Sequence, residues 1–227
     1  MDKISRRDFI FLSASFSLLV PVHGYALAVE NNSPIIYYPD TLSVLKQAFH
    51  SEMSAHKRYI KFVEKALAEN YPNIAYLFHS FSFSEKIHAT NYDRIINKLG
   101  SKIQNIPVLI DIRDTKSNLS IAAQKELEKI KITYPDFLKK LKVEEYEEAI
   151  INCMYSWKSH RQHEKKIRTI QKYADSFFGS MAKKIEGLSL DFHVCKICGS
   201  TIDEEPDSPC EICNKSMSHY QKINRPT

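Results

Sequence analysis

The sequence predicts an all-α protein, a four-helix bundle followed by a small cysteine-based metal-binding domain. Five glycines and nine prolines among 227 residues are few for a turn-rich β fold. Apolar residues recur every three or four positions in four long stretches, which is the spacing of one helix face. Four cysteines near the C-terminus form two Cys-x-x-Cys pairs. The length suits one medium-sized domain and one small domain.

The first 28 residues have the features of an export signal. Arg6-Arg7 resembles the twin-arginine motif, and the apolar run over residues 9–22 that follows it is too short to span a bilayer. Ala26-Leu27-Ala28 reads as a small-x-small cleavage site. We therefore expect residues 1–28 to be a twin-arginine signal peptide. The protein would be exported to the periplasm or the outer face of a bacterial membrane, contacting the membrane only during export. A general secretory signal and an uncleaved anchor are the alternatives.

The first two predicted helices each carry acidic or histidine side chains on an apolar face. Glu52 is the only acid in the central part of the apolar stripe over residues 40–70. Tyr71-Pro72 ends that helix, and proline opens the next one, which runs to Leu99. In the second helix Glu85 and His88 are three residues apart and therefore lie side by side. A buried ion pair is the plain interpretation of these two residues alone.

The last two predicted helices complete a possible metal site. Residues 101–116 form a long connection, which favours a crossover along the bundle. A third helix begins near Ser117, places Glu126 on its inner face and is kinked or interrupted by Pro135. A fourth runs over residues 143–173 and carries His160 on its core side, with His163 close by. Each helix thus brings a metal-capable residue to the middle of an apolar stripe, as metal-binding four-helix bundles do.

The C-terminal cysteines predict one tetrahedral metal site after a linker over residues 174–191. Eleven residues separate the two pairs, and four thiolates so spaced bind one zinc or iron. A disulfide framework, which export would favour, is the alternative. Gly199 and Asn214 each follow a pair and suit the left-handed turn that such a site needs. A fifth cysteine, Cys153, fits a buried core position. The four ligands are Cys195, Cys198, Cys210 and Cys213.

Taken together, residues 40–222 resemble the rubrerythrin family. The matching motifs are Glu52 with Arg58-Tyr59, Glu85-x-x-His88, Asn118-Leu119 with Glu126 and Tyr134-Pro135, and Gln162-His163-Glu164-Lys165. The resemblance implies a ferritin-like four-helix bundle over residues 40–173 and a rubredoxin-like domain over residues 192–222. It implies a di-iron site in the bundle and one iron at the cysteines, with zinc as the alternative there. The implied bundle ligands are Glu52, Glu85, His88, Glu126 and His163.

Two residues depart from the family pattern. Lys129 replaces a glutamate one turn after Glu126, and His160 replaces the glutamate of a Glu-x-x-His motif in the last helix. Because carboxylates balance and bridge two irons, the bundle could hold fewer than two. Lys129 could point outwards or could lie against a glutamate in the place of one metal. His160 opposite three glutamates is expected to be a sixth ligand, and simple burial is the alternative.

The resemblance implies an oxidoreductase that reduces hydrogen peroxide at the di-iron site. Electrons would come from an unknown donor through the tetracysteine iron, and Tyr59 and Tyr92 could hydrogen-bond a ligand carboxylate or be ordinary core residues. The alternatives are a non-catalytic metal-binding or electron-transfer protein, and a structural zinc in the tail. The family also implies a homodimer. A net charge of +5 without a basic block gives no support for nucleic-acid binding.

Overall fold

The structure is a computed structural model that describes residues 38–104, 107–172, 182 and 185–227. The expected signal peptide lies outside the described residues, and the expected linker lies largely outside them. No described helix is long and apolar enough to cross a membrane.

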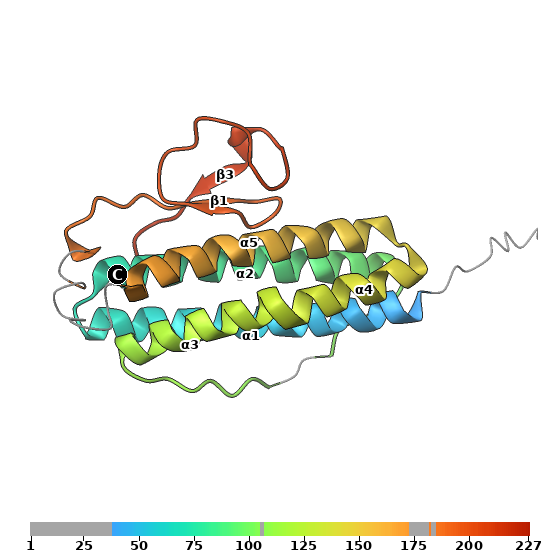
Figure 1. The fold of residues 1–227 in the computed structure, drawn as a ribbon, viewed down its shortest axis with the longest axis horizontal. Coiled ribbons are helices and arrows are strands. Elements are labelled where there is room, and N and C mark those ends of the chain that lie inside the picture. Colours follow the sequence, from blue (N-terminus) through green and yellow to red (C-terminus); the bar gives the residue numbers. More distant parts are fainter. Residues whose placement is uncertain (1–37, 105–106, 173–181, 183–184) are drawn as a thin grey trace, which may run out of the picture. The chain divides into compact units, whose positions relative to one another are not determined.

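Four helical rods form a bundle, which confirms the predicted fold class (Figure 1). Helices α1 (Pro39–Ala68) and α2 (Pro72–Lys98) pack along each other. The third rod combines α3 (Thr115–Glu128), a π-helical segment (Lys129–Thr133) and α4 (Tyr134–Glu144). The fourth rod is α5 (Glu147–Lys172).

The first two helices begin at proline and are capped by distant glutamates. Pro39 and Pro72 take the first helical positions, where a missing N–H costs nothing. The Glu144 carboxylate accepts the backbone N–H groups of Asp40 and Thr41 at 3.1 and 2.8 Å. Glu186 accepts two backbone N–H groups of the first turn of α2 in the same way. A carboxylate at this end also interacts favourably with the helix dipole.

The third and fourth rods differ in detail from the sequence expectation. Pro135 does not break the third rod, because it lies in the first turn of α4. The irregularity precedes it, in the π-helical segment, where the Ile130 carbonyl accepts the Trp157 indole N–H at 3.0 Å. Helix α5 begins four residues later than expected, because Glu145 adopts a left-handed conformation (φ 52°) and ends α4.

Two apolar clusters fill the bundle, and the polar residues of interest lie between them on every rod. On α1, for example, Glu52 separates Val44, Leu45 and Ala48 from the cluster that includes Tyr59 and Phe62. On α2, on the third rod and on α5 as well, the polar residues of the site lie between members of the two clusters. Packing of both clusters therefore holds these polar side chains in a dry centre.

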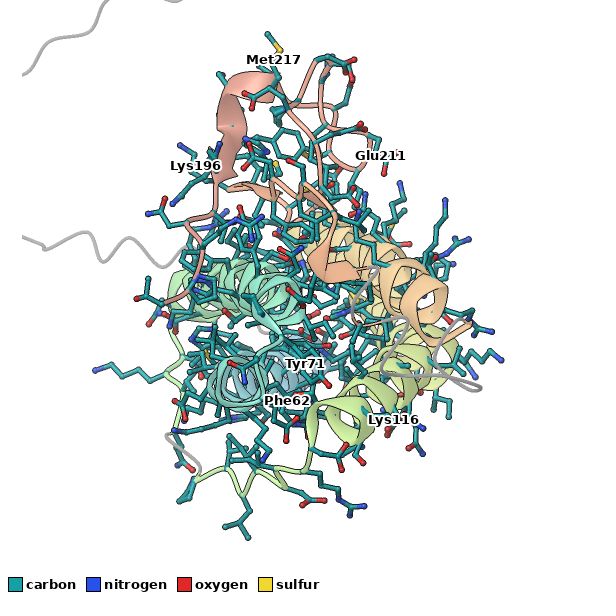
Figure 2. The ribbon with its side chains drawn as sticks, turned by 90° about the vertical axis from the view of Figure 1, so that its left-hand side faces the viewer. Phe62, Tyr71, Lys116, Lys196, Glu211 and Met217 are labelled. Atoms are coloured by element: carbon teal, nitrogen blue, oxygen red, sulfur yellow. The ribbon has the colours of Figure 1, made fainter. Side chains whose placement is uncertain are left out.

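The C-terminal residues form a small three-stranded antiparallel sheet that contacts the bundle. Its strands are β1 (His193–Cys195), β2 (Thr201–Ile202) and β3 (Tyr220–Lys222), in the order β2-β1-β3. Figure 2 shows this domain, around the labelled Lys196 and Met217, stacked on the helices. The contacts are made to α2 and α5.

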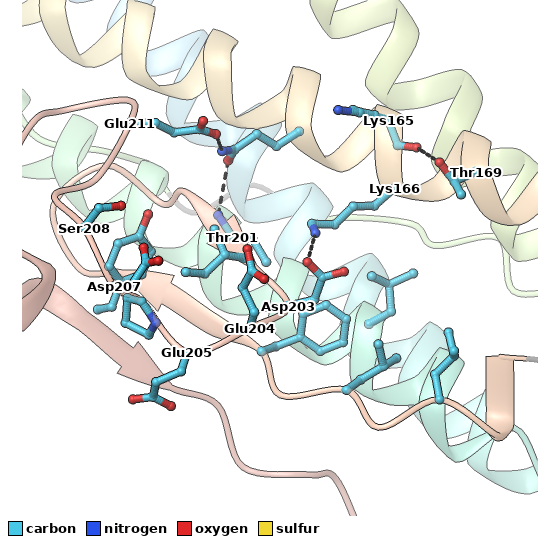
Figure 3. Close-up of a pocket in the computed structure, with 18 of the residues that line it drawn as sticks. Lys165, Lys166, Thr169, Thr201, Asp203, Glu204, Glu205, Asp207, Ser208 and Glu211 are labelled. Carbon is cyan, nitrogen blue, oxygen red and sulfur yellow. Dashed lines mark hydrogen bonds and ion pairs between the residues drawn. The ribbon is translucent and has the colours of Figure 1, made fainter.

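Polar contacts join this domain to α5 (Figure 3). Gln162 accepts the Thr201 N–H at 3.2 Å, and Lys166 pairs with Asp203 at 2.6 Å. A pocket of about 580 Å³ lies beside these contacts, lined partly by the acidic loop over residues 203–211. None of the predicted metal ligands lines it.

Candidate metal centre

All six bundle residues singled out in the sequence meet at the centre of the bundle. Each side chain is at most 1% exposed. Two overlapping groups of four have donor atoms that lie within 4.8 Å of one another. The first donor group is Glu52, Glu85, His88 and His160, and the second donor group is Glu85, Glu126, His160 and His163.

The donor set fits a metal, because several of its lone pairs have no other partner. Four buried atoms in the two groups lack any hydrogen bond: Glu85 Oε1, His88 Nδ1, His160 Nε2 and His163 Nδ1. Buried polar atoms without a partner are costly, and carboxylate oxygens and imidazole nitrogens are good ligands for iron. A metal among them would satisfy these atoms.

In two of the histidines, the ring nitrogen that faces away from the site contacts the C-terminal domain. His88 Nε2 lies 3.0 Å from the Cys198 carbonyl, which can only accept, so Nε2 carries the proton. The His88 Nδ1 lone pair then faces Glu52 and Glu85 at 3.7 and 3.5 Å. His163 Nε2 lies 3.3 Å from the Thr201 hydroxyl, and its Nδ1 faces Glu85 at 3.3 Å. Such outer hydrogen bonds orient metal-binding imidazoles.

Lys129 points into the site. Its side chain is buried, and Nζ lies 2.8 Å from Glu52 Oε2 and 3.3 Å from Glu85 Oε2. Burial alone would lower the pKa of Lys129, but the three glutamates outweigh burial and raise the pKa above its ordinary value. Lys129 therefore remains an ammonium and places a positive charge against the first donor group.

His160 and Glu126 form a close pair in the second donor group. His160 Nδ1 lies 2.7 Å from Glu126 Oε2. Burial opposes the charged form of both groups. The attraction to His160 nevertheless lowers the pKa of Glu126 to about 2, and the surrounding glutamates raise the pKa of His160 to about 10. Binding of a metal by His160 would displace its proton.

Two tyrosines donate to the glutamates. Tyr59 donates to Glu126 Oε1 at 2.5 Å, and Tyr134 donates to Glu52 Oε1 at 2.7 Å. Tyr92, for which the sequence left open a bond to a carboxylate or an ordinary core position, donates to Ser156 at 2.8 Å and lies 3.3 Å from the Tyr134 hydroxyl. Sequence reasoning missed the role of Tyr134, although the Tyr134-Pro135 pair was the available signal.

The four C-terminal cysteines converge with the geometry of one tetrahedral site. Their donor atoms lie within 4.8 Å of one another, and all are free thiols. Two of the S–S separations are 3.8 and 3.5 Å. The edge of a tetrahedron with metal–sulfur bonds of about 2.3 Å is about 3.8 Å. Gly199 and Asn214 adopt the expected positive φ angles, 77° and 55°.

The two sites meet through residues 198 and 199. Cys198 contributes its thiol to one site and its carbonyl to the His88 hydrogen bond of the other. Ser84 and Ser159 both donate to the Gly199 carbonyl, at 2.6 and 3.0 Å. A Cβ on Gly199 would lie 2.3 Å from His88 Nε2, so only glycine permits this approach.

Comparison with known proteins identifies the family. The family model described as Rubrerythrin matches residues 43–171, which is more than half of the chain. The chain belongs to the rubrerythrin family. Rubrerythrin-2 of Clostridium acetobutylicum is 30% identical over 189 residues, covering 80% of this chain and 95% of the relative. The putative rubrerythrin of Methanocaldococcus jannaschii is 24% identical, covering 84% and 96%.

Two solved structures, of nigerythrin and of a bacterioferritin, share the fold. Mixed-valence nigerythrin superposes with a TM-score of 0.69 at 22% identity, covering 82% of this chain and 88% of nigerythrin. The Desulfovibrio desulfuricans bacterioferritin, described with its di-iron site, gives a TM-score of 0.59 at 19% identity, covering 65% and 87%. Family membership makes the protein a member of a di-iron class, and its donor sets are consistent with carboxylate–histidine iron and tetracysteine iron.

Proposed function

We propose that this rubrerythrin-family protein reduces hydrogen peroxide in the bundle, with electrons that arrive through the tetracysteine site. Reduction of one peroxide to two waters consumes two electrons and two protons. Iron, when bound, supplies the electrons and polarises the O–O bond. The observation that carries the proposal is the 3.0 Å contact between His88 Nε2 and the carbonyl of Cys198, because it links the two metal-capable sites directly.

The ligand residues of this proposal are the six members of the two donor groups and the four cysteines. His88 and His163 are oriented by Cys198 and Thr201, which leaves their Nδ1 atoms free to bind. Tyr59 holds Glu126 by its outer oxygen, which leaves the other oxygen facing the centre. Both apolar clusters exclude bulk water from the site.

Turnover with a reduced rubredoxin-type donor tests this function. The natural protein, loaded with iron under anaerobic conditions, is expected to consume peroxide and oxidise the donor in a ratio of two electrons per peroxide. A Cys198→Ser variant removes a ligand of the tail iron and should lose donor-dependent turnover. Its bundle should still be oxidised once by added peroxide. Full iron loading without any turnover in the natural protein would refute the proposal.

A non-catalytic metal-binding or electron-transfer role is the second candidate, and Lys129 favours it. An ammonium bonded to Glu52 and Glu85 balances their charge without any metal. In this case the protein would bind iron at the cysteines and exchange electrons, but peroxide would not oxidise the bundle. The single oxidation by peroxide in the Cys198→Ser variant separates the two candidates.

We further propose export and a homodimeric state, with an electron donor of unknown identity outside the cytoplasm. Arg6-Arg7 and the following apolar run support export. The family resemblance supports the dimer. The molecular mass in solution, measured by light scattering, tests the dimer.

A further inference from the structure

The two halves of the bundle site differ in charge. Lys129 Nζ bonds Glu52 Oε2 and Glu85 Oε2, which are oxygens that a metal in the first donor group would also need. The second donor group uses other atoms. Glu85 Oε1 and Glu126 Oε2 face His163 Nδ1 at 3.3 and 3.9 Å. The ammonium therefore occupies one half, whereas the other half holds only the pair of His160 Nδ1 and Glu126 Oε2 at 2.7 Å, whose shared proton a metal would displace.

The charges of the site also favour one metal in the second donor group and the ammonium in the first. Three buried glutamates carry three negative charges, and Lys129 offsets one of them. Once His160 has given up its proton to bind a metal, a single divalent cation offsets the remaining two. A second divalent cation in the first donor group would share its oxygens with an ammonium, and two cations so close together repel strongly in a buried site.

Lys129 lies inside the bundle, whereas a nearby lysine on the same rod does not. Lys129 opens the π-helical segment, and its side chain is only 8% exposed. Lys125, one turn earlier on the same rod, is exposed and pairs with Glu128 at 2.9 Å. The rod thus carries one lysine inside the site and a similar one in solvent.

We infer that Lys129 takes the place of one metal, so that the bundle loads unequally. One divalent ion binds first, at Glu85, Glu126, His160 and His163. A second ion binds in the first donor group only when Lys129 leaves it. This inference requires that the bundle binds metal but does not depend on peroxide reduction, and metal binding can be measured without turnover.

Manganese(II) is a suitable ion for the test, because it prefers carboxylate and imidazole ligands over thiolates and so avoids the cysteines. Titration of the full chain, with its tail iron in place, is followed by electron paramagnetic resonance. The natural protein should take up one ion as an isolated centre, and the second ion should bind at least about tenfold more weakly. Lys129→Met should tighten the second site at least about tenfold and give a spin-coupled pair.

Three variants serve as controls. Lys125→Met makes the same charge change in solvent and should leave the dissociation constants of both manganese ions unchanged. Glu126→Gln removes a ligand of the second donor group alone and should abolish the tight ion, whereas Glu52→Gln should retain it. Circular dichroism and the visible absorbance of the tail iron verify folding, and Lys129→Gln replaces the methionine variant if that variant fails to fold.

Three results would overturn the inference. The first is that the natural protein binds two manganese ions equally tightly, with the same dissociation constants as Lys129→Met. The second is no manganese binding by the bundle of either form. The third is loss of the tight ion in Glu52→Gln but not in Glu126→Gln, which would place the first metal beside Lys129.

Discussion

At the scale of single residues, the buried charges of the bundle stabilise one another. Lys129 and His160 each lie against glutamates that would otherwise repel, so removal of one partner leaves a buried charge uncompensated. The sequence located His160 because it interrupts an apolar stripe, and it located Lys129 because it departs from the pattern of the family. It could not decide which way Lys129 points, since a lysine side chain reaches either solvent or core from the same backbone position.

The hydrogen-bond partner of the Tyr134 hydroxyl could likewise not be inferred from the sequence, and this hydrogen bond supports a prediction. It donates to ionised Glu52, whereas Tyr92 donates to the neutral hydroxyl of Ser156. Hydrogen bonds to charged groups contribute about 1.5–3 kcal/mol, and neutral ones about 0.5–1.5 kcal/mol. We expect Tyr134→Phe to lower the free energy of unfolding of the metal-free protein more than Tyr92→Phe does, measured by urea denaturation. Equal losses would contradict this assignment.

At the scale of elements, the bounds of α1 and α2 were predictable, but the boundary between the third rod and α5 was less so. Pro39 and Pro72 fix two starts through their locked φ angles. The π-helical segment and the left-handed Glu145 were not predictable, because both depend on how the third rod packs against its neighbours. The distant caps of α1 and α2 were also beyond sequence reasoning, since Glu144 and Glu186 approach only in the folded chain.

The Glu144 cap of α1 gives a prediction that depends on pH. Burial would raise the pKa of Glu144, but the N–H groups of Thr41 and Asp40 outweigh burial and lower the pKa below 4.5. The contribution of the ionised Glu144 cap to the free energy of unfolding is therefore fully present above pH 4.5, and it disappears as the pH falls through the lowered pKa. Glu144→Gln should cost about 1 kcal/mol at pH 7, or a Tm decrease of about 2–4 °C.

The exposed neighbour Glu145 provides the control for that experiment. Glu145→Gln makes the same charge change without removing a cap, so its Tm should match that of the natural protein within about 1 °C. The difference between Glu144→Gln and the natural protein should shrink below pH 4. A difference that stays constant down to pH 3 would mean that the carboxylate charge is not responsible.

At the scale of the whole molecule, the contact between the C-terminal domain and the bundle is central. The sequence predicted both metal-capable sites through their spacing, but it gave no sign that Cys198 would contact His88, because long-range contacts leave no local pattern. Gly199 was expected to serve the cysteine turn. In the structure it also permits the close approach to α2.

Two glycines provide a matched test of this contact. Gly199 and Gly100 both have positive φ angles, 77° and 72°, but an added Cβ clashes with His88 only at Gly199. Each alanine substitution should cost about 1–2 kcal/mol for the backbone conformation. Only Gly199→Ala should also slow electron transfer between the tail iron and the bundle, measured by rapid mixing with peroxide. Equal rates in both variants would show that the contact is not the electron route.

Export is the second prediction at this scale. Changing Arg6 and Arg7 together to lysine keeps the positive charge of the segment but removes the motif that twin-arginine export reads. We expect the variant to remain in the cytoplasm, as judged by cell fractionation. Unchanged export of the variant would rule out the twin-arginine assignment and leave the general secretory route.

The most direct test of the central claim is one stopped-flow experiment on the iron-loaded protein. The protein is fully reduced without oxygen and mixed with two equivalents of hydrogen peroxide, which accept up to four electrons and so can oxidise every iron of the protein, and the visible absorbance of the tetracysteine iron is followed. If the bundle reduces peroxide and draws electrons through the contact between Cys198 and His88, the red colour of the oxidised tail iron should appear as peroxide disappears. Peroxide that persists beside a fully loaded and still colourless protein would contradict the account.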